Sequence, residues 1–226
     1  MHKVYATIER PPADLIARFK AVMREVVTEN LTRDRFMDPA IKPLNGRDWT
    51  IVGPAITVKL EAFDHLMSIA AVGVAKAGDV IVIAANGHLH SAVWGGGLTS
   101  SARNIGVEAV VVDGAVMDTR AILSREVPVF CRGSHPSHGT WEKPGSINVP
   151  VACGGVIVEP GDIVCGDLDG VVVVPKRDAE RIIVACEEKT ARLRQGGAEM
   201  AANKSTLFHR RGGKDLLKKY GVEWID

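Results

Sequence analysis

Charge of one sign and long apolar runs are both missing from this chain. Lysine plus arginine number 28 and aspartate plus glutamate 27, which leaves a net charge of +1. That balance gives no overall field toward nucleic acid or an anionic membrane, so we expect neither as a partner. The apolar runs at 80–85 and 171–175 fall far short of the roughly 20 residues of a membrane span. Met1 to Tyr5 lack the apolar stretch of a secretory signal, so we expect a cytoplasmic protein.

Cysteine is scarce and unpatterned. The four cysteines, at positions 131, 153, 165 and 186, show no CxxC spacing. The sequence therefore indicates neither a zinc site nor a disulfide framework. We expect reduced thiols, most of them buried, because free cysteine behaves as a small apolar side chain.

The length and the apolar content suit one globular unit. The 226 residues, 46% of them apolar, are enough to bury a full hydrophobic core. The chain has no low-complexity segment and no internal repeat. We therefore predict a single domain over residues 1–226, with residues 195–226 as a helical C-terminal arm.

Helical and β-branched segments alternate through the first two thirds of the chain. Apolar residues at helical spacing follow Pro12 as far as Val27, and a second helical stretch covers Asp64 to Ala77. Strands are predicted at 80–83, 109–112 and 127–130, with short helices at 98–104 and 118–124. Continuous apolar strands alternating with helices predict an α/β fold, with a central sheet flanked by helices and covered on both faces.

The pattern changes in the last third of the chain. Strand-like runs at 147–151, 155–158 and 171–174 are separated by turn sequences at 160–162 and 167–170, which predict an antiparallel meander. A long helix is expected from Ala179 to Arg194, and a short one around Leu216. We expect Trp224 to dock on this chain or on a neighbour, because its ring would otherwise leave much apolar surface in water.

Three successive glycines mark a candidate binding loop. Gly95, Gly96 and Gly97 follow a buried type of strand and directly precede the helix predicted from Leu98. Ligands of α/β proteins tend to bind at such strand ends. Backbone N–H groups without side chains at a helix N-terminus attract a carboxylate or a phosphate. The alternative is a turn that binds nothing.

Two aspartates follow the next predicted strand. Asp118 opens the helix at 118–124, so it is either the N-cap of that helix or an oxygen ligand for Mg²⁺. Asp113, directly after the strand, is better explained by an Asx turn that fixes the loop.

Two histidine pairs could contribute acid–base or metal chemistry. His88 and His90 are two residues apart, so they would share a face in a strand, but no third ligand is evident nearby. His135 and His138 fall in a predicted loop, where surface histidines are common. No GxSxG elbow accompanies them.

Several motifs together resemble a known family. They are Gly95–Leu98, Gly106-Val107, Val112–Thr119, Gly139-Thr140, Gly145–Val151, Val158–Val164 and Asp167–Pro175. They look like the motifs of the class II pyruvate aldolases that cleave 4-hydroxy-4-methyl-2-oxoglutarate and 4-carboxy-4-hydroxy-2-oxoadipate. The same superfamily includes the regulator of ribonuclease activity A. The likeness runs from about Leu15 to Arg194.

The resemblance implies a β/β/α swivelling-domain fold, assembled as a homotrimer or a homohexamer with active sites at subunit interfaces. In the family's aldolases, amides of a Gly-Asp-Leu-Leu loop hold the pyruvyl carboxylate. An arginine steadies the enolate, and the aspartate that follows it anchors a divalent metal. In this chain the loop corresponds to Gly95–Leu98, the arginine position to Met117 and the metal ligand to Asp118.

Two departures from the family pattern affect the expected chemistry. Gly96 and Gly97 replace the aspartate and the first leucine of the loop, and Met117 replaces the arginine. A thioether offers almost no compensation for the negative charge of an enolate. Arg120 or Arg103 could supply that charge from another direction. The replacements also make the predicted pocket roomier and less polar.

The sequence therefore favours a lyase that depends on Mg²⁺ or Mn²⁺ and releases pyruvate from a 2-keto acid, with oxaloacetate decarboxylation as a side activity. The proton would be carried by a metal-bound water beside Glu187 or Glu188 of a neighbouring chain. One alternative is a protein-binding regulator like the ribonuclease-regulator branch. Another is a divergent metal-dependent hydro-lyase that uses His88, His90 or His138 as acid or base.

Overall fold

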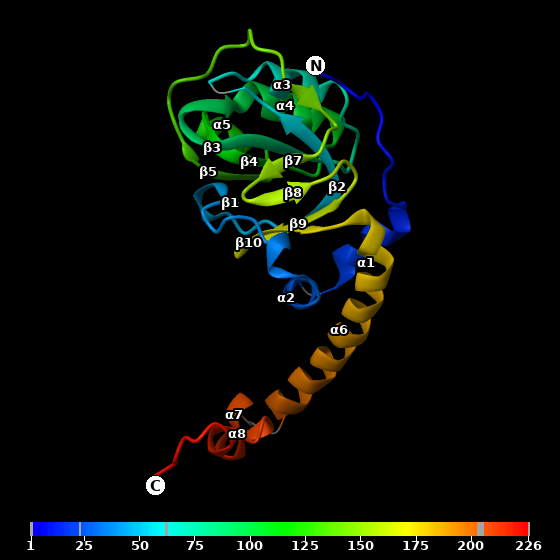
Figure 1. Cartoon of the computed structure of the whole chain (residues 1–226), viewed down its shortest axis with the longest axis vertical. Coiled ribbons are helices and arrows are strands. Elements are labelled where there is room, and N and C mark those ends of the chain that lie inside the picture. Colours follow the sequence, from blue (N-terminus) through cyan, green and yellow to red (C-terminus); the bar gives the residue numbers. More distant parts are fainter. Residues whose placement is uncertain (1, 23, 62, 203–205, 226) are drawn as a thin grey trace.

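A sheet that curls toward a closed barrel forms the body of the molecule (Figure 1). The computed structural model describes residues 2–22, 24–61, 63–202 and 206–225. Neighbouring strands follow the order β1 (Lys42–Pro43), β5 (Val129–Ser134), β4 (Ala109–Val116), β3 (Val80–Trp94), β2 (Ile51–Lys59), β9 (Ile163–Asp167) and β10 (Gly170–Val174). The two edges meet where Lys42 Nζ donates to the Asp169 carbonyl at 2.6 Å.

The strands β2 to β5 run parallel, and each is joined to the next by a helix. These helices are α3 (Leu66–Val72), α4 (Gly96–Ile105) and α5 (Thr119–Ser124). Side chains alternate along each strand. In β4, Val110 and Val112 face the core shared with these helices, whereas Ala109 and Val111 face the inside of the barrel. Both faces are buried as predicted, but the curled sheet itself, rather than a second helical layer, covers the inner one.

Residues 146–174 form paired strands in separate places, so the prediction of one continuous meander is wrong. The short strand β6 (Ser146–Ile147) pairs with β2. Next, β7 (Val151–Cys153) and β8 (Val156–Val158) make their own hairpin. The hairpin of β9 and β10 then extends the main sheet. The turn sequences mark real turns, but they do not specify which strands pair.

Three helices pack on the outer face of β9 and β10. They are α1 (Ala13–Ala21), α2 (Arg24–Glu29) and α6 (Ala179–Ala202), and their core includes Phe19, Val26, Cys186 and Ile183. The single helix predicted after Pro12 is interrupted because the backbone of Val22 is extended, with ψ of 157°. The helix predicted over 64–77 is also shorter than expected, since α3 ends at Val72 before Gly73. Short 3-10 turns occur at η1 (Arg33–Arg35), η2 (Leu44–Gly46) and η3 (Lys176–Asp178).

The helix α6 carries the C-terminal segment away from the body (Figure 1). At its far end lie α7 (Leu207–Arg210) and α8 (Gly213–Lys219). Trp224 packs on Phe208 of this same segment, with ring centroids 5.2 Å apart, and remains 49% exposed. Among the helices of the described ranges, none combines the length and the apolar character of a membrane span. All four cysteines are free and buried, as predicted.

Candidate functional site

Two neighbouring parallel strands end side by side and bring the glycine loop to Asp118. Trp94 at the end of β3 is paired with Val116 at the end of β4. The Met117 amide donates to the Trp94 carbonyl at 2.9 Å. The segment Gly95–Gly97 and the turn Met117-Asp118 are therefore in contact, as expected when parallel strands end at one edge.

The carboxylate of Asp118 binds the start of the other helix. Its Oδ2 accepts a hydrogen bond from the Gly96 amide at 3.1 Å. Helix α4 begins at Gly96 rather than at the predicted Leu98, so this bond satisfies one of its open N–H groups. Asp118 precedes α5 with φ of 56°, and its side chain makes no capping bond to that helix. The alternative that Asp118 caps its own helix is therefore wrong.

Two of the three glycines are required by close packing. A Cβ atom on Gly95 would lie 3.0 Å from Cγ of Met117, and one on Gly96 would lie 2.8 Å from Cβ of Ala121. A Cβ atom on Gly97 would meet nothing within 4 Å. The loop is thus a tightly packed helix start whose open side lies at Gly97.

That open side presents backbone donors. The Thr99 amide donates to the Gly95 carbonyl at 3.0 Å, which is the first i to i−4 bond of α4. The amides of Gly97 and Leu98 precede this bond and point toward the helix N-terminus. Such a terminus, with its positive dipole end, suits a carboxylate.

Positive side-chain charge is sparse here. Met117 is half-buried against Gly95, and Arg120 is exposed on the first turn of α5. Arg103 lies in the last turn of α4, about 10 Å along the helix axis from Gly96. It is therefore away from the site formed by Gly95–Leu98 and Asp118, which we call the cradle. No sequence pattern points to Arg125, which reaches from the end of α5 to Ser100 Oγ and to the Ala121 carbonyl.

The site offers a divalent cation one carboxylate oxygen, that of Asp118. Asp118 is exposed, and one of its two carboxylate oxygens is used by Gly96. Mg²⁺ is commonly held by one or two carboxylates, with water and substrate as its other ligands, so Asp118 fits that role. The described part of the chain has no group of three or more His, Cys, Asp or Glu side chains arranged to hold a metal.

The predicted glutamates lie on a different helix. Glu187 and Glu188 belong to α6, which packs against α1 and α2. Within a single chain they are therefore not brought together with Asp118. Arg18 binds both oxygens of Glu187, with Nε and Nη2 each at 2.8 Å. Hydrogen bonding from Arg18 lowers the pKa of Glu187. Among the described residues, no ion pair engages Glu188, which is exposed.

His88, His90 and Asp113 lie within β3 and β4, and His135 directly follows β5. The strand β3 continues through His88 and His90, whose ring centroids are 5.6 Å apart. The His135 amide donates to the Val116 carbonyl at 2.9 Å. Asp113 does not form the expected Asx turn. It accepts from Arg132 Nε at 2.5 Å and from the Gly154 amide at 2.9 Å, which ties β4 to β5 and to the β7–β8 turn.

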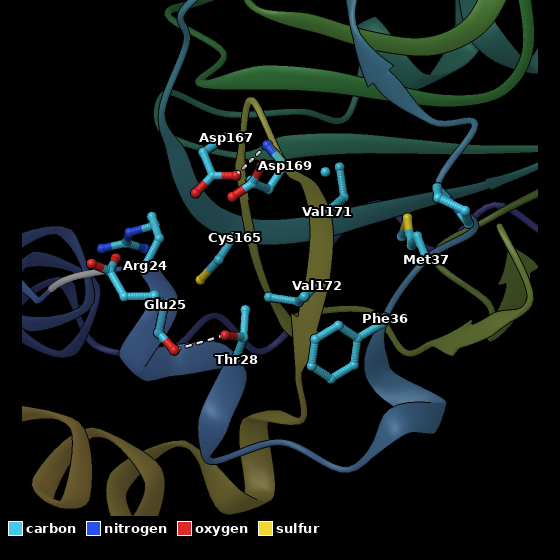
Figure 2. A pocket seen from close by; sticks show the side chains of 13 residues that line it. Arg24, Glu25, Thr28, Phe36, Met37, Cys165, Asp167, Asp169, Val171 and Val172 are labelled. Atoms are coloured by element: carbon cyan, nitrogen blue, oxygen red, sulfur yellow. Dashed lines mark hydrogen bonds between the residues drawn. The ribbon is translucent and has the colours of Figure 1, made fainter. Parts of the chain in front are cut away.

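A cavity of about 680 Å³ lies between α2, η1 and the β9–β10 hairpin (Figure 2). Phe36, Met37, Cys165 and Val172 form its apolar wall, with Asp167 and Asp169 at one side. None of the site residues predicted from the sequence lines it. This cavity is therefore separate from the cradle at Gly96 and Asp118.

Comparison with known proteins gives one family. The profile of the RraA-like family, described as Aldolase/RraA, matches residues 22–173. A protein of Halalkalibacterium halodurans, named provisionally as a 4-hydroxy-4-methyl-2-oxoglutarate aldolase, is 38% identical over 178 residues, covering 79% of this chain and 84% of that protein. An uncharacterised protein of Methanocaldococcus jannaschii is 36% identical over 179 residues, covering 75% of this chain and 86% of that protein. The crystal structure of Streptomyces coelicolor RraAS2, described as an unusual member of the RNase ES inhibitor RraA family, superposes with a TM-score of 0.76 at 28% identity, over 84% of this chain and 98% of that one.

Proposed function

Because this chain belongs to the RraA-like family, which includes aldolases and RraA proteins, we propose that it is a lyase that cleaves a C–C bond of a 2-keto acid and releases pyruvate. The proposal includes Mg²⁺ or Mn²⁺ as cofactor and the β/β/α swivelling-domain arrangement of the family. It also includes a homotrimer or homohexamer that completes the site at a subunit interface.

The contact between Asp118 and Gly96 carries this proposal. It places an exposed carboxylate beside two open amides, so that one small region offers an oxygen ligand for a cation and donors for an anion. A 2-keto acid requires both features, since its carboxylate needs donors and its developing enolate needs positive charge. A regulator that only binds a protein needs neither.

The chain's own groups would divide the work as follows. The amides of Gly97 and Leu98 bind the substrate carboxylate and orient the keto acid at the helix start. Asp118 holds the divalent ion, which when bound supplies the Lewis acidity that aldol cleavage requires. Arg120, exposed on the adjacent turn, adds positive charge from the α5 side in place of the side chain at position 117.

The proton must come from another element. In aldol cleavage the proton leaves the C4 hydroxyl, the C3–C4 bond breaks, and a proton returns to C3 of the pyruvate enolate. Glu188 of a neighbouring copy is the better candidate for moving this proton, because Arg18 already binds both oxygens of Glu187 within the chain. A carboxylate held in that fork, with its pKa lowered, is a poor proton acceptor.

The test is pyruvate release by the purified protein from oxaloacetate and from 4-hydroxy-4-methyl-2-oxoglutarate, with and without Mg²⁺ or Mn²⁺. Pyruvate that depends on the metal and is lost in Asp118→Asn supports the proposal. No pyruvate from well-folded, metal-loaded protein overturns it.

Water addition or loss without C–C cleavage would instead favour the hydro-lyase, and His88→Ala, His90→Ala and His138→Ala would then identify its acid or base. Light scattering coupled to size-exclusion chromatography separates a monomer from the proposed trimer or hexamer.

A further inference from the structure

Six rings form two groups beside the proposed site, and the two groups are joined through the backbone, where the Thr140 amide donates to the Phe63 carbonyl at 2.8 Å. Phe63 meets His88 edge-on with centroids 4.2 Å apart, and His88 lies 5.6 Å from His90. The ring of Trp141 is parallel to that of His138, at 6.3 Å and 5°. His65 is edge-on to both Trp141 and His138, at 5.6 and 6.1 Å. We call these six residues, Phe63, His65, His88, His90, His138 and Trp141, the ring array.

A buried carboxylate holds two of the array's segments in place. Asp64 is 1% exposed and accepts hydrogen bonds from Thr140 Oγ1 at 2.7 Å and from the Glu142 amide at 2.7 Å. The His65 amide donates to the Thr140 carbonyl at 2.8 Å. These bonds join residues that are more than 70 positions apart in the sequence. These hydrogen bonds therefore fix the two segments that carry the array relative to one another.

The array has the properties of a surface that binds a ligand. Phe63 and Trp141 are 52% and 60% exposed, which is high for large rings in so well-tied a frame. Nδ1 of His65 and Nε2 of His88 are buried and have no hydrogen-bond partner among the described residues. Buried polar atoms are nearly always satisfied, so an orphan of this kind indicates a missing partner. A cavity of about 420 Å³ adjoins His88 and His90, which is large enough for a ring.

The array begins close to the cradle. The Ala92 amide donates to the Ser137 carbonyl at 2.8 Å, and the Gly139 amide donates to the Ala92 carbonyl at 3.2 Å. The loop that carries His138 is therefore fixed to β3 at Ala92. Gly95 is three residues further along the chain, about 10 Å for an extended backbone. A keto acid longer than pyruvate can reach from one to the other.

We propose that the ring array binds the distal half of the substrate, and that this half is an aromatic ring attached at C4 of a 4-hydroxy-2-oxo acid. This inference rests on the proposed lyase function. Flat rings stack on Trp141 and meet Phe63 edge-on, while the free imidazole nitrogens of His65 and His88 bind oxygen substituents. In the simplest case, 4-hydroxy-2-oxo-4-phenylbutanoate gives benzaldehyde and pyruvate. The C4 hydroxyl loses its proton, the C3–C4 electron pair remains on pyruvate as its enolate, and C3 regains one proton.

The experiment compares kcat/KM for 4-hydroxy-2-oxo-4-phenylbutanoate, 4-hydroxy-4-methyl-2-oxoglutarate and oxaloacetate. We expect the aryl substrate to exceed the methyl dicarboxylate by at least about tenfold. Trp141→Ala should lower the ratio of aryl to oxaloacetate kcat/KM by about tenfold, since oxaloacetate has no ring to stack. Tyr220→Ala, which removes an exposed ring at the end of α8 in the C-terminal segment, should leave that ratio unchanged.

Failure of this inference can be distinguished from failure of the lyase proposal. If oxaloacetate gives pyruvate but the methyl dicarboxylate is preferred, or Trp141→Ala leaves the ratio unchanged, the array proposal is overturned and the lyase remains. If no substrate gives pyruvate, the lyase is overturned. Calorimetric titration with 2-oxo-4-phenylbutanoate measures binding to the array without turnover, because this compound lacks the 4-hydroxyl that cleavage requires. An affinity about tenfold weaker in Trp141→Ala supports ring binding, and equal affinity overturns it.

Discussion

Asp118 caps a helix that is not its own. Its Oδ2 accepts the Gly96 amide at 3.1 Å, although Asp118 stands at the end of β4 and Gly96 at the start of α4. A side chain in the left-handed conformation, with φ of 56°, turns away from the helix that follows it. This geometry leaves the second carboxylate oxygen available and fixes the first.

The two uses of Asp118 can be separated by a pair of variants. Asp118→Asn keeps an oxygen that accepts the Gly96 amide but removes the charge, so we expect nearly unchanged stability with at least a hundredfold loss of metal-dependent pyruvate release. Asp118→Ala removes the cap as well and should lower the free energy of unfolding by about 1 kcal/mol. Urea denaturation and a coupled pyruvate assay measure both. Full activity in Asp118→Asn would contradict the assigned role.

Gly96 and Gly97 should respond in opposite ways to the same substitution. A Cβ on Gly96 would meet Cβ of Ala121 at 2.8 Å, whereas one on Gly97 would meet nothing within 4 Å. Gly96→Ala should therefore destabilise the protein by about 1–3 kcal/mol, because it pushes α4 from α5. Gly97→Ala should stabilise α4 by up to about 1 kcal/mol. Equal melting temperatures for the two variants would show that the helices separate without cost.

The strands that bear the site could be predicted because their apolar runs are continuous. Val80–Ile83 and Val110–Val112 are β-branched and buried on both faces, which identifies two adjacent parallel strands and so places Gly96 near Asp118. No strand is predicted over β2, which contains the dipeptide Gly53-Pro54, and both residue types are rare inside strands. Within the sheet, Gly53 lies so close to the Gly78 carbonyl that a Cβ would be only 2.3 Å from it. The glycine is there for close packing rather than for a bend.

The strand that carries His88 and His90 extends further than its sequence pattern indicates. Polar residues after Ala85 are typical of a strand end, but β3 continues through them with register shifts at His88 and Ala92. The ring array also needs Phe63 and Trp141, whose segments Asp64 joins through bonds to Thr140 and Glu142 that no local pattern encodes. Long-range hydrogen bonds of this kind cannot be read from spacing.

Restoring a cation at position 117 should increase turnover. Met117 is half-buried, with Cγ 3.0 Å from where a Gly95 Cβ would be, so this side chain lies against the cradle. In Met117→Arg a guanidinium would be available to an enolate, and we expect kcat for oxaloacetate to rise about tenfold or more. Met117→Leu serves as the uncharged control of similar volume. An unchanged rate in Met117→Arg would mean that the reaction already has its positive charge, which the proposal assigns to Arg120.

The thiols should be inert in the folded protein. Burial raises the pKa of Cys131 and of Cys165 to about 11, and it raises the pKa of Cys153 and Cys186 as well. The thiolate is the reactive form, so a disulfide reagent at pH 8 should modify almost none of the four in native protein and all four in urea. Rapid native labelling of any cysteine would show that its segment opens readily.

The ionisation of Asp64 should contribute to stability in a defined range of pH. Burial raises the pKa of its carboxyl group, but bonds from Thr140 and from the amides of Leu66, Glu142 and Lys143 outweigh burial and place the pKa below its ordinary value. A lowered folded pKa gives stability that is complete above the unfolded pKa of about 3.9 and is lost as the pH falls through the folded value. Asp64→Asn should therefore be less stable than the parent by about 1–3 kcal/mol at pH 7.

The difference in the free energy of unfolding between the parent and Asp64→Asn should narrow as the pH is lowered from 5 to 3. Urea denaturation across this range measures it, and Glu142→Gln provides an exposed control whose stability should follow that of the parent. Since the same bonds hold His65 and Trp141 in position, Asp64→Asn should also weaken binding of 2-oxo-4-phenylbutanoate at pH 7. If that difference stays constant with pH, the hydrogen bonds of Asp64, and not its negative charge, fix the segments that carry the ring array.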